Sequence, residues 1–301
     1  MLKIGIIGLG DIAQKAYLPV VSSLKEIEWH LYTRNEEKLI DISNKYRFTH
    51  THQSLLALIE AGIQGAFVHS STESHYMIVK QLLSAGIHVY VDKPITYDFQ
   101  TSKELVDLAE ENNVILMTGF NRRFAPAYED LTKMNDINMI ILQKNRKLLP
   151  SDIRTFIFDD FIHVVDTVRF LLNDEIEVAT INGRIQDGLL YSVVVQFSAK
   201  GKIGLAIMNR DSGVVEEKLE IMGSNEKRTV VNLSEWMVSQ NKTETKYSFH
   251  DWDSTLYKRG FEQIISEFTE AIRKDIKPSI TAIDALKTHE ICEEIVQYLE
   301  K

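Results

Sequence analysis

The chain has 301 residues and a single cysteine, Cys292, so it cannot form an internal disulfide. This cysteine usage is compatible with a reducing cytoplasm, where we expect the protein to act. Basic residues are also fewer than acidic ones. The chain has 34 Lys and Arg and 43 Asp and Glu, so its formal net charge at pH 7 is −9. Proteins that bind nucleic acid usually carry a basic face, so that class is not expected.

Long hydrophobic runs are missing as well. No apolar run approaches the ~20 residues of a membrane span, so no membrane partner is expected. The apolar N-terminus is short, breaks at Gly8 and Gly10 and has no small-residue cleavage site, which favours a strand over a signal peptide. Hydrophobic residues make up 44% of the chain and charged residues 26%, which is typical of a globular protein.

The first part of the chain alternates between two hydrophobic periods. The first short apolar run covers residues 2–7 and the last covers residues 114–117. Segments whose apolar residues recur at helical spacing lie between the runs. This alternation predicts βαβ units around a doubly wound parallel sheet. We therefore expect a first domain over residues 1–120.

The pattern changes after Gly119. A strand is predicted over residues 139–142, a helix over 159–172, and helices over 257–274 and 282–299. Several runs of two-residue period lie between them, punctuated by glycines, which is typical of antiparallel strands. The fold class is therefore α/β, with a second, α+β domain over residues 121–301 that contains a largely antiparallel open sheet.

A glycine turn follows the first predicted strand and opens the first helix: Gly8-Leu9-Gly10-Asp11-Ile12-Ala13. Glycines permit a tight turn, and the helix N-terminus offers free N–H groups and a partial positive charge to a pyrophosphate. An ordinary βα turn is the alternative, but the position within a βαβ series favours a dinucleotide-binding Rossmann domain. The residues expected to contact the cofactor here are Gly8, Gly10, Asp11, Ile12 and Ala13.

The end of the second predicted strand distinguishes NAD(H) from NADP(H). Domains that bind NAD(H) usually carry an acid there, which holds the ribose hydroxyls. This chain has Thr33 and Arg34 instead, with Lys38 one helical turn later. Arg34 could pair with a 2′-phosphate, Thr33 could donate a hydroxyl and Lys38 could add charge. NADP(H) is therefore favoured over NAD(H), with a solvated surface charge as the alternative for Arg34.

Lys93 follows another predicted strand, in Val91-Asp92-Lys93-Pro94. Pro94 cannot donate a hydrogen bond to the sheet, so the strand ends before it. Ligands of open α/β sheets bind outside the carboxyl ends of the strands. Lys93 is therefore either a surface residue or a catalytic cation.

Asp159, His163 and Asp166 fall at positions i, i+4 and i+7 of a helix that is otherwise mostly apolar. Taken alone, this stripe favours a solvated face. Beside a cofactor domain it also fits catalysis, because a histidine with a near-neutral pKa can move the proton of a hydroxyl. A lysine at the same oxygen would stabilise developing alkoxide charge.

Together these motifs resemble the glucose–fructose oxidoreductase / inositol dehydrogenase (Gfo/Idh/MocA) family of nicotinamide-dependent oxidoreductases, and several strings are similar to its virulence-factor-type subgroup. The matching segments are the glycine turn and residues 66–75, 85–94, 119–126, 159–166 and 221–224. The resemblance implies that Lys93 is the active-site lysine, that His163 is the general acid–base and that Asp159 hydrogen-bonds the substrate or this pair. It also implies a set of cofactor-flanking residues: Ser70, Ser71, Thr72, His75, Asp92, Lys93, Pro94 and Asn121.

The chain departs from the family at two places. The usual Glu-Lys-Pro is Asp92-Lys93-Pro94, and Phe161 stands where the family has a glycine. We expect hydride transfer between NAD(P) and a hydroxyl or carbonyl carbon of a small polar substrate, such as a sugar or polyol. A nicotinamide-binding sensor without turnover and a nicotinamide-dependent glycosidase are the alternatives. The resemblance further implies a homodimer or homotetramer assembled through the C-terminal sheet.

Two other patterns leave their roles open. His50 and His52 alternate along a strand, but no third ligand follows at a useful spacing, so a surface pair is favoured and no metal site is predicted. Arg122 and Arg123 could hold a substrate anion or form structural ion pairs.

Overall fold

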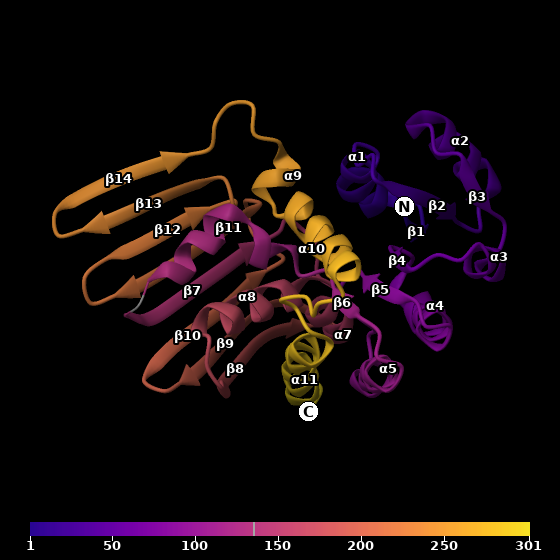
Figure 1. Ribbon diagram of the computed structural model, residues 1–301. Coiled ribbons are helices and arrows are strands. Elements are labelled where there is room, and N and C mark those ends of the chain that lie inside the picture. The colour runs from indigo at the N-terminus through magenta and orange to yellow at the C-terminus, as the bar shows by residue number, and fades with distance from the viewer. Residues whose placement is uncertain (135) are drawn as a thin grey trace. The chain divides into compact units, whose positions relative to one another are not determined.

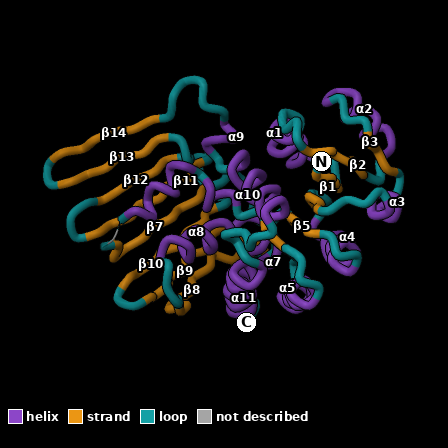
Figure 2. Tube along the Cα trace, in the orientation of Figure 1, coloured by secondary structure: helices purple, strands orange, loops and turns teal. Residues whose placement is uncertain are grey.

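The computed structural model describes residues 1–134 and 136–301, which form two compact units. Unit 1 consists of Met1–Phe120 and Phe261–Lys287, and unit 2 of Asn121–Gly260 and Thr288–Lys301. Each unit has its own sheet (Figure 1, Figure 2). Unit 1 thus includes a segment from late in the chain. The division into domains over residues 1–120 and 121–301 stays a proposal.

Unit 1 is built on a parallel sheet in the order β3-β2-β1-β4-β5-β6. Its strands are β1 (Leu2–Ile7), β2 (Ile27–Tyr32), β3 (His50–His52), β4 (Gly65–Val68), β5 (His88–Val91) and β6 (Leu116–Thr118). The direction of the strand order reverses between β1 and β4, which pair in parallel. Ligands of doubly wound sheets bind at such a switch point, outside the carboxyl ends of the strands. The predicted doubly wound sheet is confirmed.

Helical segments connect these strands: η1 (Ala13–Tyr17), α1 (Leu18–Val21), α2 (Glu36–Tyr46), α3 (Leu55–Glu60), α4 (Thr72–Ser84) and α5 (Phe99–Glu111). Side-chain caps fix the starts of three of them, α2, α3 and α5. Ser54 accepts from the Ala57 amide at 3.1 Å, and Asp98 accepts from the Thr101 amide at 2.8 Å. Each cap satisfies an amide that has no partner within its helix.

Helix α10 (Phe261–Lys274) completes the apolar core of unit 1, although it lies far along the chain. Phe268 packs edge-on against Phe67 with ring centroids 5.0 Å apart. Ile272 approaches Gly65 so closely that a Cβ on this glycine would lie 2.6 Å from the Ile272 side chain. Since Gly65 and Phe67 both belong to β4, α10 covers the centre of the sheet.

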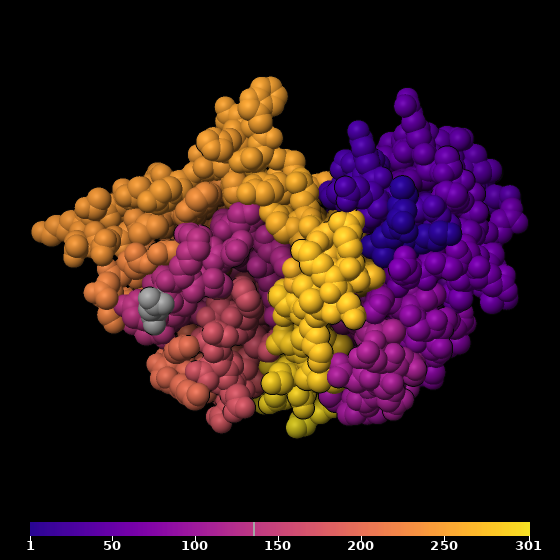
Figure 3. Space-filling view, viewed as in Figure 1, coloured from indigo at the N-terminus to yellow at the C-terminus, as the bar shows by residue number. Residues whose placement is uncertain are grey.

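Unit 2 is built on a second sheet in the order β14-β13-β12-β11-β7-β10-β9-β8. Its strands are β7 (Ile137–Asn145), β8 (Glu177–Gln186), β9 (Leu189–Ala199), β10 (Lys202–Asn209), β11 (Glu216–Gly223), β12 (Lys227–Val231), β13 (Glu235–Gln240) and β14 (Thr243–Ser248). Neighbouring strands are antiparallel except β7 and β10, which pair in parallel. All of β14 is exposed, at the orange edge of Figure 3. The predicted, largely antiparallel sheet is confirmed.

Helical segments of unit 2 are η2 (Asn121–Phe124), α6 (Pro126–Glu129), η3 (Asp130–Lys133), α7 (Ile153–Thr155), η4 (Phe156–Phe161), α8 (Ile162–Leu172) and α9 (Thr255–Lys258). Helix α11 (Ala282–Leu299) begins in unit 1 and ends in unit 2. Helix α8 packs on β10 at Gly204, where a Cβ would lie 2.7 Å from Val168 and 2.9 Å from Leu172. This close approach fixes the position of α8 on the sheet.

Two predicted helices differ from the structure. The helix predicted over residues 257–274 is divided into α9 and α10, because Gly260 takes a φ of +77°. A Cβ there would overlap the Asn121 carbonyl oxygen. The helix predicted over residues 159–172 begins earlier, with the π-helical segment η4 ahead of α8.

Among the described residues, no helix combines the length and apolar character of a membrane span.

Candidate active site

The glycine turn joins β1 to the first helical segment at the switch point. Gly8 takes a φ of +86°, and its amide donates to the Tyr32 carbonyl at 3.0 Å. A Cβ on Gly8 would lie 2.5 Å from the Ser70 amide nitrogen, so the chain itself requires glycine here. A Cβ on Gly10 would meet no heavy atom of the described chain within 4 Å. This open space is where a pyrophosphate could approach the backbone.

The other residues of the turn differ in exposure. Ala13 is fully buried at the start of η1, as close packing of the helix on the sheet requires. Ile12 is 37% exposed. Asp11 is exposed and pairs with Lys15 at 2.8 Å. Contacts of these side chains with a cofactor stay predictions.

The predicted ribose-binding residues lie between β2 and α2. Asn35 caps α2 by accepting from the Lys38 amide at 2.8 Å. Thr33 is half-buried, whereas Arg34 and Lys38 are exposed. The first turn of α2 also carries the exposed acid Glu36. The structure thus keeps Arg34 and Lys38 accessible, and their role toward a 2′-phosphate stays a prediction.

His75 connects the loops that follow β4 and β5. It is 1% exposed, with Nδ1 3.0 Å from the Pro94 carbonyl oxygen and Nε2 3.0 Å from the Ser70 carbonyl oxygen. Ser71 is the N-cap residue of α4, and Thr72 is its first residue. We interpret His75 as a residue that positions both loops, while direct contact with a cofactor stays a prediction for these residues.

Lys93 is half-buried, two residues after the end of β5. Its amide donates to Oδ1 of Asp92 at 3.0 Å, and the Lys93–Pro94 peptide is cis. A Cβ on Gly119 would lie 3.0 Å from the same Asp92 oxygen. Asp92 stands where the family has a glutamate. Its carboxylate therefore lies against the backbone at the end of β5 and at the end of the neighbouring strand, β6.

His69, beside this strand end, does not suit proton transfer. Its ring lies 3.8 Å from the Tyr17 ring, and the side chain is 4% exposed. Burial, and secondarily the nearby His75, lowers the pKa of His69 to about 3. A histidine that stays neutral over the ordinary pH range packs the core of unit 1 and is a poor general acid.

Unit 2 carries the other predicted catalytic residues. Asp159 lies half-buried on the π-helical segment η4, a type of turn that is frequent at functional sites. His163 is 9% exposed in the first turn of α8, and Asp166 is 1% exposed. The alternative of a solvated face is therefore wrong. Lys93 belongs to unit 1, so its pairing with His163 stays a prediction.

Asp166 and Asn121 make contacts within unit 2. Arg123 donates to both carboxylate oxygens of Asp166 at 2.9 and 2.5 Å, and Thr288 donates at 3.0 Å. The Asn121 amide donates to the Arg259 carbonyl at 2.8 Å. Asp166 is thus a structural residue, and contact of Asn121 with the nicotinamide stays a prediction.

Arg122 belongs to a buried ion pair. Its Nε and one Nη donate to the two carboxylate oxygens of Glu217 at 2.8 and 2.7 Å. The Tyr128 hydroxyl donates to Glu217 at 3.0 Å. Burial alone raises the pKa of Glu217, but Arg122 outweighs it and lowers the pKa to about 2. Arg123 pairs with Asp166, so both arginines form structural ion pairs. Of the two alternatives for these arginines, a substrate-anion site and structural ion pairs, the structure shows the second.

Lys144 and Asp160 form a second buried pair that sequence reasoning missed. The Lys144 ammonium contacts Asp160, which Arg146 also binds at 3.1 Å. Burial, followed by repulsion from Arg122, lowers the pKa of Lys144 to about 7. The two-residue period of a strand identifies Lys144 as buried. It lies two residues after Leu142 on β7, so both side chains point to the buried face of this strand. The predicted strand ended too early, at residue 142, to include it.

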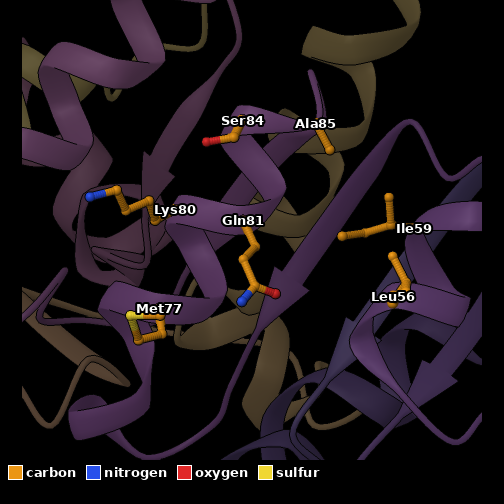
Figure 4. A pocket seen from close by; sticks show the side chains of 7 residues that line it. All are labelled: Leu56, Ile59, Met77, Lys80, Gln81, Ser84 and Ala85. Atoms are coloured by element: carbon orange, nitrogen blue, oxygen red, sulfur yellow. The ribbon is translucent and has the colours of Figure 1, made fainter.

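A surface hollow of about 540 Å³ lies between α3 and α4 (Figure 4). It is lined by Leu56, Ile59, Met77, Lys80, Gln81, Ser84 and Ala85. Leu56 and Met77 are 63% and 57% exposed, so the hollow is open to solvent. None of the predicted site residues lines it, and we do not assign it to the active site.

Residues 2–120 match the GFO/IDH/MocA oxidoreductase family with an NAD-binding Rossmann fold, and residues 126–241 match the YceM-like C-terminal domain. A Salmonella typhimurium protein named as the oxidoreductase YceM is 32% identical, over 97% of this chain and 96% of its own. The structure of a dehydrogenase (MviM) from Clostridium difficile is similar with a TM-score of 0.95 and 33% identity, over 99% of both chains. A myo-inositol 2-dehydrogenase from Thermotoga maritima is 23% identical over 94% of this chain and 92% of its own. The chain therefore belongs to the Gfo/Idh/MocA family of NAD(P)-dependent oxidoreductases.

Proposed function

We propose that the protein transfers a hydride between NADP(H) and a hydroxyl-bearing carbon of a sugar, a polyol or a derivative of one. The observation that carries this proposal is the open space at Gly10, at the switch point of a sheet whose strand ends also carry Lys93. The similarity to a myo-inositol 2-dehydrogenase supports a polyol-like substrate.

The proposed chemistry divides among three side chains. NADP(H), when bound, supplies or accepts the hydride. His163 takes the hydroxyl proton during oxidation and returns it during reduction. Lys93 polarises the same oxygen and stabilises its developing negative charge. Asp159 hydrogen-bonds the substrate or this pair, which favours the charged form of His163 and opposes the repulsion between the two cations.

Steady-state turnover across a panel of sugars and polyols, measured with NADP⁺ and with NAD⁺, tests the proposed function. We expect a change in nicotinamide absorbance that depends on both the substrate and the enzyme. Cofactor binding without turnover of any compound would instead favour a sensor. Cleavage of a glycoside without net consumption of the cofactor would favour a glycosidase.

Exchange of Arg34 for an acid is expected to remove a preference for NADP(H). The wild type should bind NADPH more tightly than NADH, because the guanidinium can pair with the 2′-phosphate. Arg34→Asp should weaken NADPH binding by about tenfold or more, about 1.4 kcal/mol, and leave NADH binding nearly unchanged. A fluorescence titration measures both affinities. Lys45→Asp, on an exposed residue in the last turn of α2, is the control and should alter neither. Equal affinities of the wild type for the two cofactors would remove this assignment.

We also propose a homodimer or homotetramer that assembles through the face of the unit 2 sheet opposite α8. This face bears apolar side chains, since Val194 and Ile203 are 38% and 37% exposed. Gly204 faces α8, so its neighbour Ile203 points to the other side of the sheet.

A cytoplasmic location remains a proposal, compatible with the single buried thiol of Cys292.

A further inference from the structure

Three histidines and a glutamate gather on one face of β2 and β3 in unit 1: Glu28, His30, His50 and His52. Side chains two residues apart on a strand point to the same side. The two strands pair in parallel with His30 opposite His50, so the four side chains meet. The His30 ring centroid lies 4.7 Å from that of His50 and 5.1 Å from that of His52, with the rings nearly parallel.

The atoms of this cluster are close enough to share a metal ion. One ligand atom from each of Glu28, His30 and His50 lies within 4.8 Å of the other two. Nε2 of His30 is 2.9 Å from Oε1 of Glu28, and Nδ1 is 2.9 Å from Nε2 of His52. Imidazole nitrogens and carboxylate oxygens bind Zn²⁺ at about 2.0–2.2 Å. Small side-chain rotations would therefore bring three ligands around one ion.

We propose that Glu28, His30 and His50 form a binding site for Zn²⁺ or a similar divalent transition metal. His52 is a positioning residue: His30 binds the ion in the tautomer whose Nδ1–H donates to Nε2 of His52. Such an outer hydrogen bond fixes the ring orientation of a metal-binding histidine. Three protein ligands leave a fourth position for water.

One neighbouring cation competes with a metal ion for the Glu28 carboxylate. The Lys3 ammonium, 3.5 Å from Glu28, is the competing cation. Its side chain is 41% exposed and can move into solvent when an ion binds.

The order of the ligands along the chain does not reveal this site in the sequence. Glu28 and His30 lie before His50, on β2, and helix α2 separates β2 from β3. Only the pairing of β2 with β3 brings them together. His30, at 3% exposure, anchors the cluster in the fold, and the exposed His50 lies at its open side.

Calorimetric titration of the untagged, chelator-treated chain with Zn²⁺ tests the proposal. We expect one ion per chain for the wild type, with loss of more than about tenfold in affinity in Glu28→Gln and in His50→Gln. His52→Gln should lose about tenfold, as for other outer-shell partners of metal-binding histidines. Zn²⁺ should raise the midpoint of thermal unfolding of the wild type more than that of His50→Gln.

His250→Gln, at an exposed histidine of unit 2, is the matched control and should bind Zn²⁺ as the wild type does. Because His50 is exposed, its exchange should leave the fold intact, which circular dichroism would check. The absence of Zn²⁺ binding to the wild type, or unchanged binding by His50→Gln, would overturn the proposal. None of these measurements depends on catalytic activity.

Discussion

Lys93→Met and His163→Ala should each lower turnover by about a hundredfold to ten-thousandfold. Methionine keeps the length of Lys93 but removes the charge that would polarise the reacting oxygen. Alanine removes the imidazole that would carry the hydroxyl proton. Neither change removes the open turn at Gly10, so the affinity for NADPH should stay nearly intact. Steady-state kinetics and a fluorescence titration measure the two effects separately.

Matched controls distinguish loss of chemistry from loss of structure. Lys103→Met alters a lysine of α5 whose side chain is 45% exposed and pairs with Asp107, and it should leave turnover unchanged. His163 is 9% exposed, so the fold of His163→Ala should be compared with that of the wild type by circular dichroism. Wild-type turnover in either active-site variant would rule out the assigned role. A loss of NADPH binding with normal turnover at saturation would reassign the residue to cofactor binding.

Glu217→Gln is expected to lower the free energy of unfolding by about 3 kcal/mol, because it leaves the Arg122 charge buried and unpaired. Arg122 and Glu217 are each 7% exposed. In the folded protein the pKa of Glu217 is about 2, below its ordinary value of 4.5. The stabilisation is therefore fully present above about pH 4.5 and is lost as the pH falls toward 2. Denaturant titrations at several pH values measure this difference.

Glu220→Gln provides the comparison on the same strand, β11. Glu220 contacts Lys227 and lies 3.4 Å from Lys218, and its side chain is 18% exposed. Ion pairs at this kind of partly exposed position contribute about 1 kcal/mol or less. We expect a small loss of stability there and a large one in Glu217→Gln. Equal denaturant midpoints of Glu217→Gln and the wild type at neutral pH would show that the buried ion pair is not needed for the stability of the fold.

The fold could be predicted largely from local patterns. The helix predicted over residues 282–299 has the bounds of α11, because helical periodicity is a property of neighbouring residues. Gly8 was recognisable for the same reason, since a turn between a strand and a helix needs a special backbone conformation. The π-helical segment η4 was not predictable in this way, because residues 156–161 carry no local pattern that separates it from an ordinary helix turn.

The polar interior of unit 2 depended on contacts between distant residues. Arg122 meets Glu217 and Lys144 meets Asp160 only after β7, β11 and η4 have been assembled. Nothing in the sequence near Arg122 identifies its partner. The side chains proposed for catalysis could be named from their motifs, whereas the buried charges that support unit 2 required the structure.

The late position of α10 has a consequence for the synthesis of the protein. Phe268 and Ile272 cover β4, so the core of unit 1 is incomplete when residue 120 leaves the ribosome. Residues 121–260 must be translated before α10 can reach its place. At about 5–20 residues per second, the nascent Rossmann sheet exposes Phe67 for on the order of ten seconds. The dinucleotide-binding unit can therefore finish folding only after the strands of unit 2 that precede α10 have been translated.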